Sequence, residues 1–140
     1  MAQPPNASPL RDTEMSGFVA TENGARCREF YEGKLRFNVV SDDPMAMVML
    51  DASGRRIRVQ KLKKHAPQMF TVMGWTTRDI EASVTRLAEA GVTCEQFQFP
   101  GQDARGITTF PDGARVAWFK DPDGNILSLD QAPLSGGRRE

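Results

Sequence analysis

The sequence has few of the residues that build metal, redox or nucleophilic sites. It contains one histidine, His65, and two cysteines, Cys27 and Cys94, among 140 residues. The two cysteines show neither zinc-site nor CxxC spacing, so we expect buried, reduced thiols. His65 follows a lysine-rich stretch that we interpret as a solvated linker. No Ser–His–acid or Cys–His arrangement can be assembled around a histidine in that position.

The chain also lacks net charge and long hydrophobic runs. Its 18 basic and 18 acidic residues cancel, which argues against nucleic acid as a partner and against a specialist for strongly cationic ligands. No apolar run approaches the roughly 20 residues that cross a bilayer, so we expect no membrane partner. The N-terminus shows no basic region followed by an apolar stretch. From these absences we expect a cytoplasmic protein.

What remains is the composition of one ordinary globular domain, with 39% hydrophobic and 26% charged residues. Residues 1–14 are polar and rich in proline, and they are predicted to form a flexible tail. Residues 133–140 are predicted to form a second flexible tail. The sequence therefore predicts a single domain over residues 15–132.

A turn that occurs twice gives this domain an internal repeat. Asp121–Gly124 has the composition of a tight turn between two β-prone runs. It aligns without a gap with Asp51–Gly54, and the flanking residues 118–130 align with 48–60. The sequence therefore predicts one structural unit that is used twice.

Both units show the same order of predicted elements. In each, a short strand precedes a helix that begins at a capping residue, Asn23 or Asp79. Module one, residues 15–63, then has strands at about 36–41, 45–50 and 55–61. Module two, residues 67–132, has strands at 69–75, 92–97, 114–120 and 125–130. It also has a polar loop over 100–111, with room for a short extended piece at 107–110.

The order predicts an α+β fold in which two βαβββ modules form one cup-shaped mixed β-sheet with both helices on its outer face. Apolar residues alternate with polar ones in the last strand of each module, which predicts a buried face and a polar face. The buried face should hold Ile57, Val59, Leu127 and Leu129. By the same parity we expect Phe119, Trp75 and the alternating methionines 45, 47 and 49 in the core under the helices, with Tyr31 packed against them.

Three motifs resemble the glyoxalase/bleomycin resistance/dioxygenase superfamily, also called vicinal oxygen chelate (VOC) proteins. They are Phe30-Tyr31-Glu32, Asp79-Ile80-Glu81-Ala82 and the segment from Trp118 to Asn125. Their order and spacing, together with the repeat, extend the resemblance over roughly residues 15–132. The resemblance implies the cup-shaped fold, a site inside the cup, and in many members a divalent metal.

The resemblance also implies where such a metal would be held, and the ligands are missing there. The family's positions fall on Ser16, Arg58, Val72 and Ser128. None of these is a good ligand for a divalent cation, and a guanidinium repels one. Gln60 and Asp130 lie two residues further along their strands and are displaced by roughly 6–7 Å. We therefore expect no metal and no cofactor.

Strand parity selects the residues that line the predicted cup. Arg58 is suited to hold a carboxylate or phosphate, or else to pair with Asp130 or another acid inside the cup. Trp118 is suited to stack on a flat ligand, or else to fill the cup or a dimer interface. The predicted ligand-binding residues are Phe18, Arg58, Gln60, Trp118, Lys120, Ser128 and Asp130. No catalytic residue is assigned, and whether any reaction is catalysed stays open.

Three hypotheses about function follow. The first is a metal-independent small-molecule binding protein of the glyoxalase/bleomycin-resistance-like type. The alternative is a metal-dependent VOC enzyme, a lyase, isomerase or dioxygenase, with atypical ligands. The third is a cup filled by side chains in a protein that acts through protein contacts. In each case we expect a homodimer, as is common among similar proteins.

Overall fold

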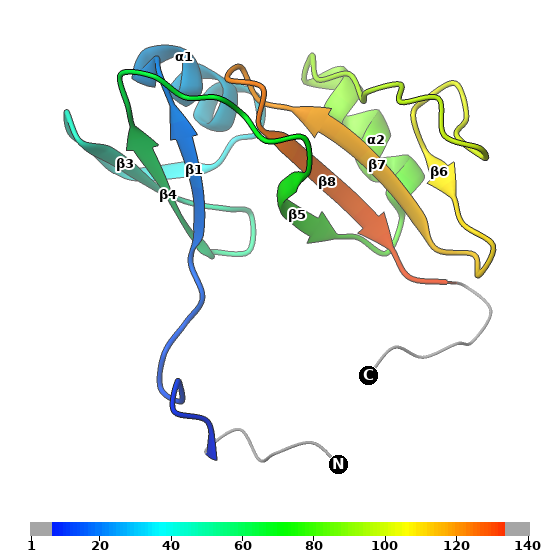
Figure 1. Ribbon diagram of the computed structural model, residues 1–140, viewed down its shortest axis with the longest axis horizontal. Helices are drawn as coiled ribbons and strands as arrows, with labels where there is room; N and C mark the ends of the chain where they lie inside the picture. Colours follow the sequence, from blue (N-terminus) through cyan, green and yellow to red (C-terminus); the bar gives the residue numbers. More distant parts are fainter. Residues whose placement is uncertain (1–6, 134–140) are drawn as a thin grey trace.

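The computed structural model describes residues 7–133 and contains two consecutive modules of the same order (Figure 1). Module one comprises β1 (Gly17–Thr21), α1 (Gly24–Arg28), the π-helix η2 (Glu29–Lys34), β2 (Asn38–Asp42), β3 (Ala46–Leu50) and β4 (Arg56–Lys61). Module two comprises β5 (Thr71–Thr76), α2 (Ile80–Glu89), β6 (Thr108–Thr109), β7 (Arg115–Lys120) and β8 (Ile126–Gln131). The chain within 7–133 has no helix long and apolar enough to cross a membrane.

Each module folds into a four-stranded mixed sheet. The strand orders are β1-β4-β3-β2 and β5-β8-β7-β6, and in both the first strand pairs in parallel with the last. The predicted α+β fold of two βαβββ modules is confirmed. The sheets lie side by side where β1 approaches β5, with the helices behind them in Figure 1. The continuous sheet that we expected is thus two sheets, because the ladder hydrogen bonds do not run from β1 to β5.

The two predicted helix starts are confirmed. The side chain of Asn23 accepts a hydrogen bond from the Arg26 backbone N–H at 3.1 Å, and that of Asp79 accepts one from Ala82 N–H at 3.1 Å. Each cap satisfies an N–H group that has no partner within the helix. The first helix then widens into a π-helical turn, in which Leu35 N–H donates to the Phe30 carbonyl at 3.0 Å.

The core lies between the sheets and the helices and joins both modules. Ile57, Val59 and Leu127 are at most 3% exposed, as strand parity predicts. The predicted core positions of Tyr31, Trp75, Phe119, Met47 and Met49 are also confirmed, and Leu129 packs at the edge of the core.

Met45 is a wrong prediction, because its side chain is 78% exposed. It lies before β3 rather than in it, in a turn where Asp43 accepts hydrogen bonds from the N–H groups of Met45 and Ala46. The alternation of methionines therefore begins one residue before the strand does.

The predicted strand over 92–97 is also wrong. Glu95 N–H donates to the Trp118 carbonyl at 2.7 Å, but the segment is irregular. The Gln102 side chain accepts from the N–H groups of Phe97 and Gln98 and donates to the Glu95 and Gly106 carbonyls. One carboxamide thus makes the bonds that a neighbouring strand would make. The edge strand of this sheet is the two-residue β6 instead.

The ends of the chain are only partly described. Residues 7–16 form a turn and then an extended stretch that stands away from the two sheets before β1 begins (Figure 1). Residues 1–6 and 134–140, which make up most of both predicted tails, lie outside the described residues. The limits of the domain and of its tails stay a prediction.

Candidate functional site

The predicted ligand-binding residues fall into two groups, one on each sheet, and all lie on the faces turned away from the helices. In β4 the exposed residues Arg58 and Gln60 alternate with the buried Ile57 and Val59. Phe18 is the register partner of Arg58 and is 53% exposed. The structure thus brings Phe18 and Arg58 together on the open face of the first sheet.

The second sheet carries the other four residues. Trp118 lies opposite Ser128 in the ladder between β7 and β8, and its indole N–H donates to the Thr71 hydroxyl at 3.1 Å. Lys120 follows on the same face of β7, 4.0 Å from the Glu95 carboxylate. Asp130 accepts a hydrogen bond from the Thr76 hydroxyl at 3.0 Å.

The two interpretations of Arg58 are resolved in part. Asp130 is held by Thr76, and within residues 7–133 no ion pair involves Arg58. The internal pair that we weighed against ligand binding is therefore not formed. The guanidinium stays available on the exposed face.

Trp118 belongs to an aromatic recess that the sequence analysis missed. Its ring lies 5.7 Å from that of Phe97 and 5.4 Å from that of Phe99, both on the irregular segment after α2. The recess has a volume of about 680 Å³. The Thr108 hydroxyl at its edge is buried and has no hydrogen-bond partner within residues 7–133. The residues lining the recess are Phe99, Pro100, Gly101, Thr108, Thr109, Phe110, Pro111 and Trp118.

The recess depends on the segment around Phe97 and Phe99, whose sequence contains one pattern that could have indicated it. Phe97 and Phe99 alternate just before Pro100 and Gly101, which places two rings on one side of an extended stretch that then turns. We interpreted 92–97 as a strand and the following residues as a loop. Nothing in the sequence indicated that the stretch lies over Trp118.

Phe18 lines a different hollow, of about 620 Å³, where the two sheets meet. Val72, Gly74 and Arg56 also line it. A Cβ at Gly74 would collide with the Ser128 hydroxyl and lie 3.2 Å from the Ser128 carbonyl oxygen, so a side chain there would force Ser128 to shift. Phe18 and Trp118 therefore line separate hollows rather than one cup.

The residues at the metal positions implied by the family do not suit a divalent cation. Ser16, Val72, Arg58 and Ser128 offer two hydroxyls, an alkyl group and a cation. Over residues 7–133 no group of three or more His, Cys, Asp or Glu side chains is placed to hold a metal ion.

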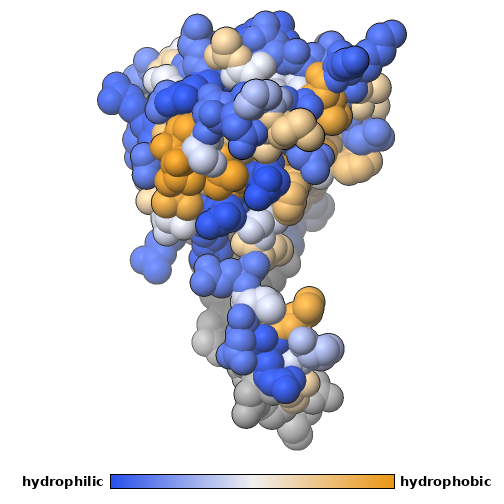
Figure 2. Space-filling model, turned by 90° about the vertical axis from the view of Figure 1, so that its left-hand side faces the viewer, coloured by the Kyte–Doolittle hydropathy of each residue, from blue (hydrophilic) through white to orange (hydrophobic). Residues whose placement is uncertain are grey.

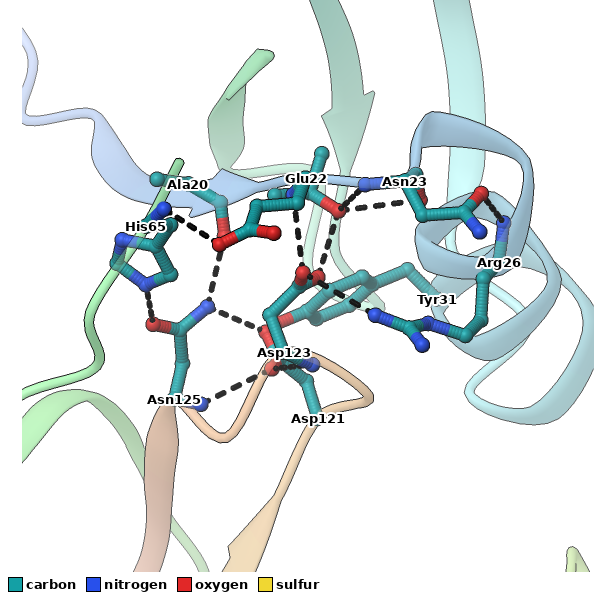
Figure 3. Close-up of polar contacts among 10 residues, drawn as sticks. Ala20, Glu22, Asn23, Arg26, Tyr31, His65, Asp121, Asp123 and Asn125 are labelled. Carbon is teal, nitrogen blue, oxygen red and sulfur yellow. Dashed lines mark hydrogen bonds and ion pairs between the residues drawn. The ribbon is translucent and has the colours of Figure 1, made fainter. Parts of the chain in front are cut away.

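His65 is engaged elsewhere, which corrects its interpretation as a solvated residue. It is half-buried, and its Nε2 lies 2.7 Å from Asn125 Oδ1 (Figure 3). Asn125 in turn donates to the Ala20 carbonyl and to the Asp121 carboxylate. His65 therefore ties the linker between the modules to the turn of module two.

A buried hydrogen-bond network surrounds that turn (Figure 3). The Tyr31 hydroxyl donates to Asp121 at 2.7 Å, and burial together with the Asp121 charge raises the Tyr31 pKa well above its usual value. Cys27 lies nearby, and burial, aided by the charge of Asp121, raises its pKa to about 12. Burial also raises the pKa of Cys94, and both cysteines are free, buried thiols as predicted. The Tyr31–Asp121 bond joins the two modules, and the buried Tyr31, Cys27 and Cys94 side chains offer no accessible nucleophile.

The comparisons with known proteins identify the family. A sequence profile of the Glyoxalase/Bleomycin resistance protein/Dioxygenase superfamily matches residues 17–129. The chain belongs to this superfamily. A comparison with curated protein sequences found no match to this chain.

Solved structures of the superfamily share the fold of this VOC chain. A lactoylglutathione lyase from Agrobacterium tumefaciens is 12% identical with a TM-score of 0.64, over 91% of this chain and 98% of its own. A superfamily member from Sphaerobacter thermophilus is 25% identical with a TM-score of 0.63, over 84% and 94%. TnmS3, an antibiotic binding protein from a Streptomyces species, is 20% identical with a TM-score of 0.59, over 83% and 92%.

Proposed function

We propose that this VOC protein is a metal-independent binding protein for a small, flat organic molecule, held on the open face of the second sheet. Membership of the superfamily supports small-molecule binding, and the similar fold of an antibiotic binding protein agrees with it. The single observation that carries the proposal is the aromatic recess around Trp118.

The recess has the size and chemistry of a ligand pocket. Its 680 Å³ falls within the range of about 300–1,000 Å³ that small-molecule sites occupy. The Trp118 and Phe99 rings are inclined at 66°, so a planar ligand can stack on one ring and meet the edge of the other. Thr108 also lines the recess, and its buried hydroxyl has no hydrogen-bond partner within residues 7–133.

The other predicted residues give polar contacts around this recess in the proposal. Lys120 and Ser128 share the open face with Trp118, and they offer a cation and a hydroxyl beside the rings. Phe18, Arg58, Gln60 and Asp130 lie further off and are proposed to contact the extremities of a larger ligand.

Metal independence is tested by thermal unfolding of chelator-stripped protein with Mn²⁺, Fe²⁺, Ni²⁺ or Zn²⁺. A metal bound only by the folded state at about 100 times its Kd adds about 2.7 kcal/mol of stability, an easily measured rise in Tm. We expect no such rise. A saturable rise that is lost in Gln60→Ala or Asp130→Ala would instead favour the metal-dependent enzyme.

Ligand binding in the recess is tested through tryptophan fluorescence, because the chain has only two tryptophans. In Trp75→Phe, Trp118 is the sole reporter, and we expect its emission to be quenched saturably by 4-nitrotoluene, an uncharged planar quencher. Phe99→Ala should weaken the quenching about threefold to tenfold, since it removes one ring contact. Phe70→Ala, a change at an exposed phenylalanine outside the recess, is the matched control. Quenching that rises linearly without saturation would contradict the recess as a site.

We also propose that the protein is a homodimer. Several large apolar side chains outside the proposed ligand site are exposed, including Val40, Met45 and Leu62. Figure 2 shows hydrophobic residues gathered in a patch bordered by hydrophilic ones at the end of the molecule that faces the viewer. Contiguous apolar surface of this kind marks interfaces. Sedimentation equilibrium should give twice the mass of the 15.5 kDa chain, and the single-chain mass would contradict the proposal.

A further inference from the structure

We propose that the protein has a second binding site, on the side opposite the open sheet faces, for an organic anion with an aromatic or aliphatic body. The site is the groove between the end of η2, the turn Asp51–Ser53 and helix α2, with a volume of about 640 Å³. Trp75 and Leu129 line it from the helix-covered side of their strands. It is therefore separate from the recess at Trp118.

The floor of the groove is apolar and partly aromatic. Leu35, Leu87 and Leu129 are half-buried there and line the groove. Trp75 packs between Phe37 and Phe119, with ring centroids 5.7 Å and 6.5 Å away. Its indole N–H donates to the Asp51 carboxylate at 3.0 Å, which fixes the ring. A ligand body in the groove gains apolar burial against a preformed surface.

The rim of the groove is cationic. Lys34, Arg36 and Arg86 line it, and none of them takes part in an ion pair within residues 7–133. The two carboxylates that also line it are Glu89 and Asp51. Asp51 already accepts hydrogen bonds from the N–H groups of Ser53, Arg55 and Trp75, so three donors compensate its charge.

The hollow that Phe18 lines adjoins the groove and contributes further positive charge. It shares Asp51, Ser53, Trp75 and Thr76 with the groove and adds Arg55 and Arg56. These two arginines also have no ion pair within the described chain. Five cations without ion pairs within residues 7–133 thus line the groove and the adjoining hollow, against two carboxylates, Asp51 and Glu89, in a protein whose net charge is zero. This clustering favours an anionic ligand over a neutral one.

The test uses full-length Trp118→Phe, in which Trp75 in the groove is the sole tryptophan. The probes are 4-nitrobenzoate and 4-nitrotoluene, which both quench indole fluorescence on contact. The first carries a carboxylate where the second carries a methyl group. We expect saturable quenching of Trp75 by 4-nitrobenzoate, with 4-nitrotoluene about tenfold weaker because it makes no ion pair. Lys34→Gln and Arg86→Gln should each weaken 4-nitrobenzoate about threefold, since both cations are solvent-facing.

Arg78→Gln is the matched control, because Arg78 is an exposed cation outside the groove and close to α2 in sequence. It should leave the binding of 4-nitrobenzoate unchanged. Equal quenching by the two probes, or an equal loss in Arg78→Gln and Arg86→Gln, would overturn the proposal, as would quenching that never saturates. The same probes applied to Trp75→Phe report on the recess at Trp118, so the failure of one site is distinguished from the failure of the other.

Discussion

The two copies of the repeated turn share one backbone and differ in what surrounds them. In both, the glycine has φ +84°, and the Gly54 and Gly124 N–H groups donate to the Asp51 and Asp121 carbonyls at 2.9 and 3.0 Å. Each aspartate also accepts a hydrogen bond from an aromatic residue of the other module. Trp75 donates to Asp51, and Tyr31 donates to Asp121. The turns thus connect the modules reciprocally.

The difference lies in two side chains of the turn. Asp123 accepts hydrogen bonds from the Thr21 hydroxyl at 2.6 Å and from Glu22 N–H at 3.0 Å, and Asn125 donates to the Ala20 carbonyl. In the other copy, Ser53 and Arg55 occupy these positions and make no such bonds to module two within residues 7–133. The Asp121 turn is consequently a closed junction, whereas the Asp51 turn borders an open groove. The same local fold is stabilising in one place and leaves room for a ligand in the other.

Replacing the two aspartates should give the largest effect and the clearest contrast. Asp121→Ala leaves the buried Tyr31 hydroxyl, the Asn125 amide and two backbone N–H groups without their partner. We expect a loss of about 4 kcal/mol in the free energy of unfolding. Asp51→Ala removes the partner of three donors instead of four, beside the open groove, and should lose about 2 kcal/mol.

Urea unfolding followed by circular dichroism measures both variants at pH 7. Glu14→Ala, at an exposed carboxylate in the extended stretch before β1, is the control and should change stability by less than about 0.5 kcal/mol. Equal losses at positions 51 and 121 would show that the two turns are equivalent after all.

Tyr31→Phe removes one hydrogen bond of the closed junction and should cost about 2 kcal/mol at pH 7. It should also change the response to alkali. Because the Tyr31 pKa is raised in the folded state, the unfolded phenol loses its proton first, near pH 10. The stability that Tyr31 contributes is therefore fully present below pH 10 and falls as the pH rises above it.

Urea unfolding between pH 8 and pH 11 measures this pH-dependent contribution of Tyr31 to the free energy of unfolding. Wild type should lose stability more steeply above pH 10 than Tyr31→Phe, while both keep the decline above pH 9 that the raised Cys27 pKa causes. Parallel curves for the two proteins would count against the buried phenol–carboxylate contact.

The sequence predicted the turns better than it predicted their surroundings. The alternation of Arg58 with Ile57 and Val59 predicted both faces of β4, because a strand places successive side chains on opposite faces. The caps Asn23 and Asp79 could be predicted equally well, because a capping side chain bonds a backbone N–H only three residues further along the chain.

Contacts between residues far apart in the chain could not be predicted from the sequence. The fold of 92–111 depends on the Gln102 carboxamide, and neither periodicity nor composition indicates where one side chain will make its bonds. His65 lies 60 residues from Asn125 and appeared to be a linker residue for the same reason. Strand parity therefore predicted the face of β7 on which Trp118 lies, and the irregular segment that packs against Trp118 was missed.

Alanine at the two turn glycines separates the shared backbone from the different surroundings. Both glycines have a positive φ, so each Gly→Ala change carries a common strain of about 1 kcal/mol. A Cβ at position 54 meets no atom within 4 Å, but at position 124 it lies 3.0 Å from the Pro67 ring. We expect losses of about 1 kcal/mol for Gly54→Ala and about 2 kcal/mol for Gly124→Ala. Thermal unfolding of the pair decides this, and an equal loss would mean that Pro67 moves away without cost.

The smallest effect is expected at His65, the linker residue that reaches the closed turn. His65→Ala removes the contact with Asn125 Oδ1, while Asn125 keeps its bonds to Ala20 and Asp121. Because the imidazole is half-buried and water can take its place, we expect a loss of about 1 kcal/mol. Lys64→Ala, at an exposed neighbour in the same linker, should change stability by less than about 0.5 kcal/mol. Equal effects at positions 64 and 65 would mean that the linker does not strengthen the junction, and the contrast between the turns would then depend on Asp123 and Asn125 alone.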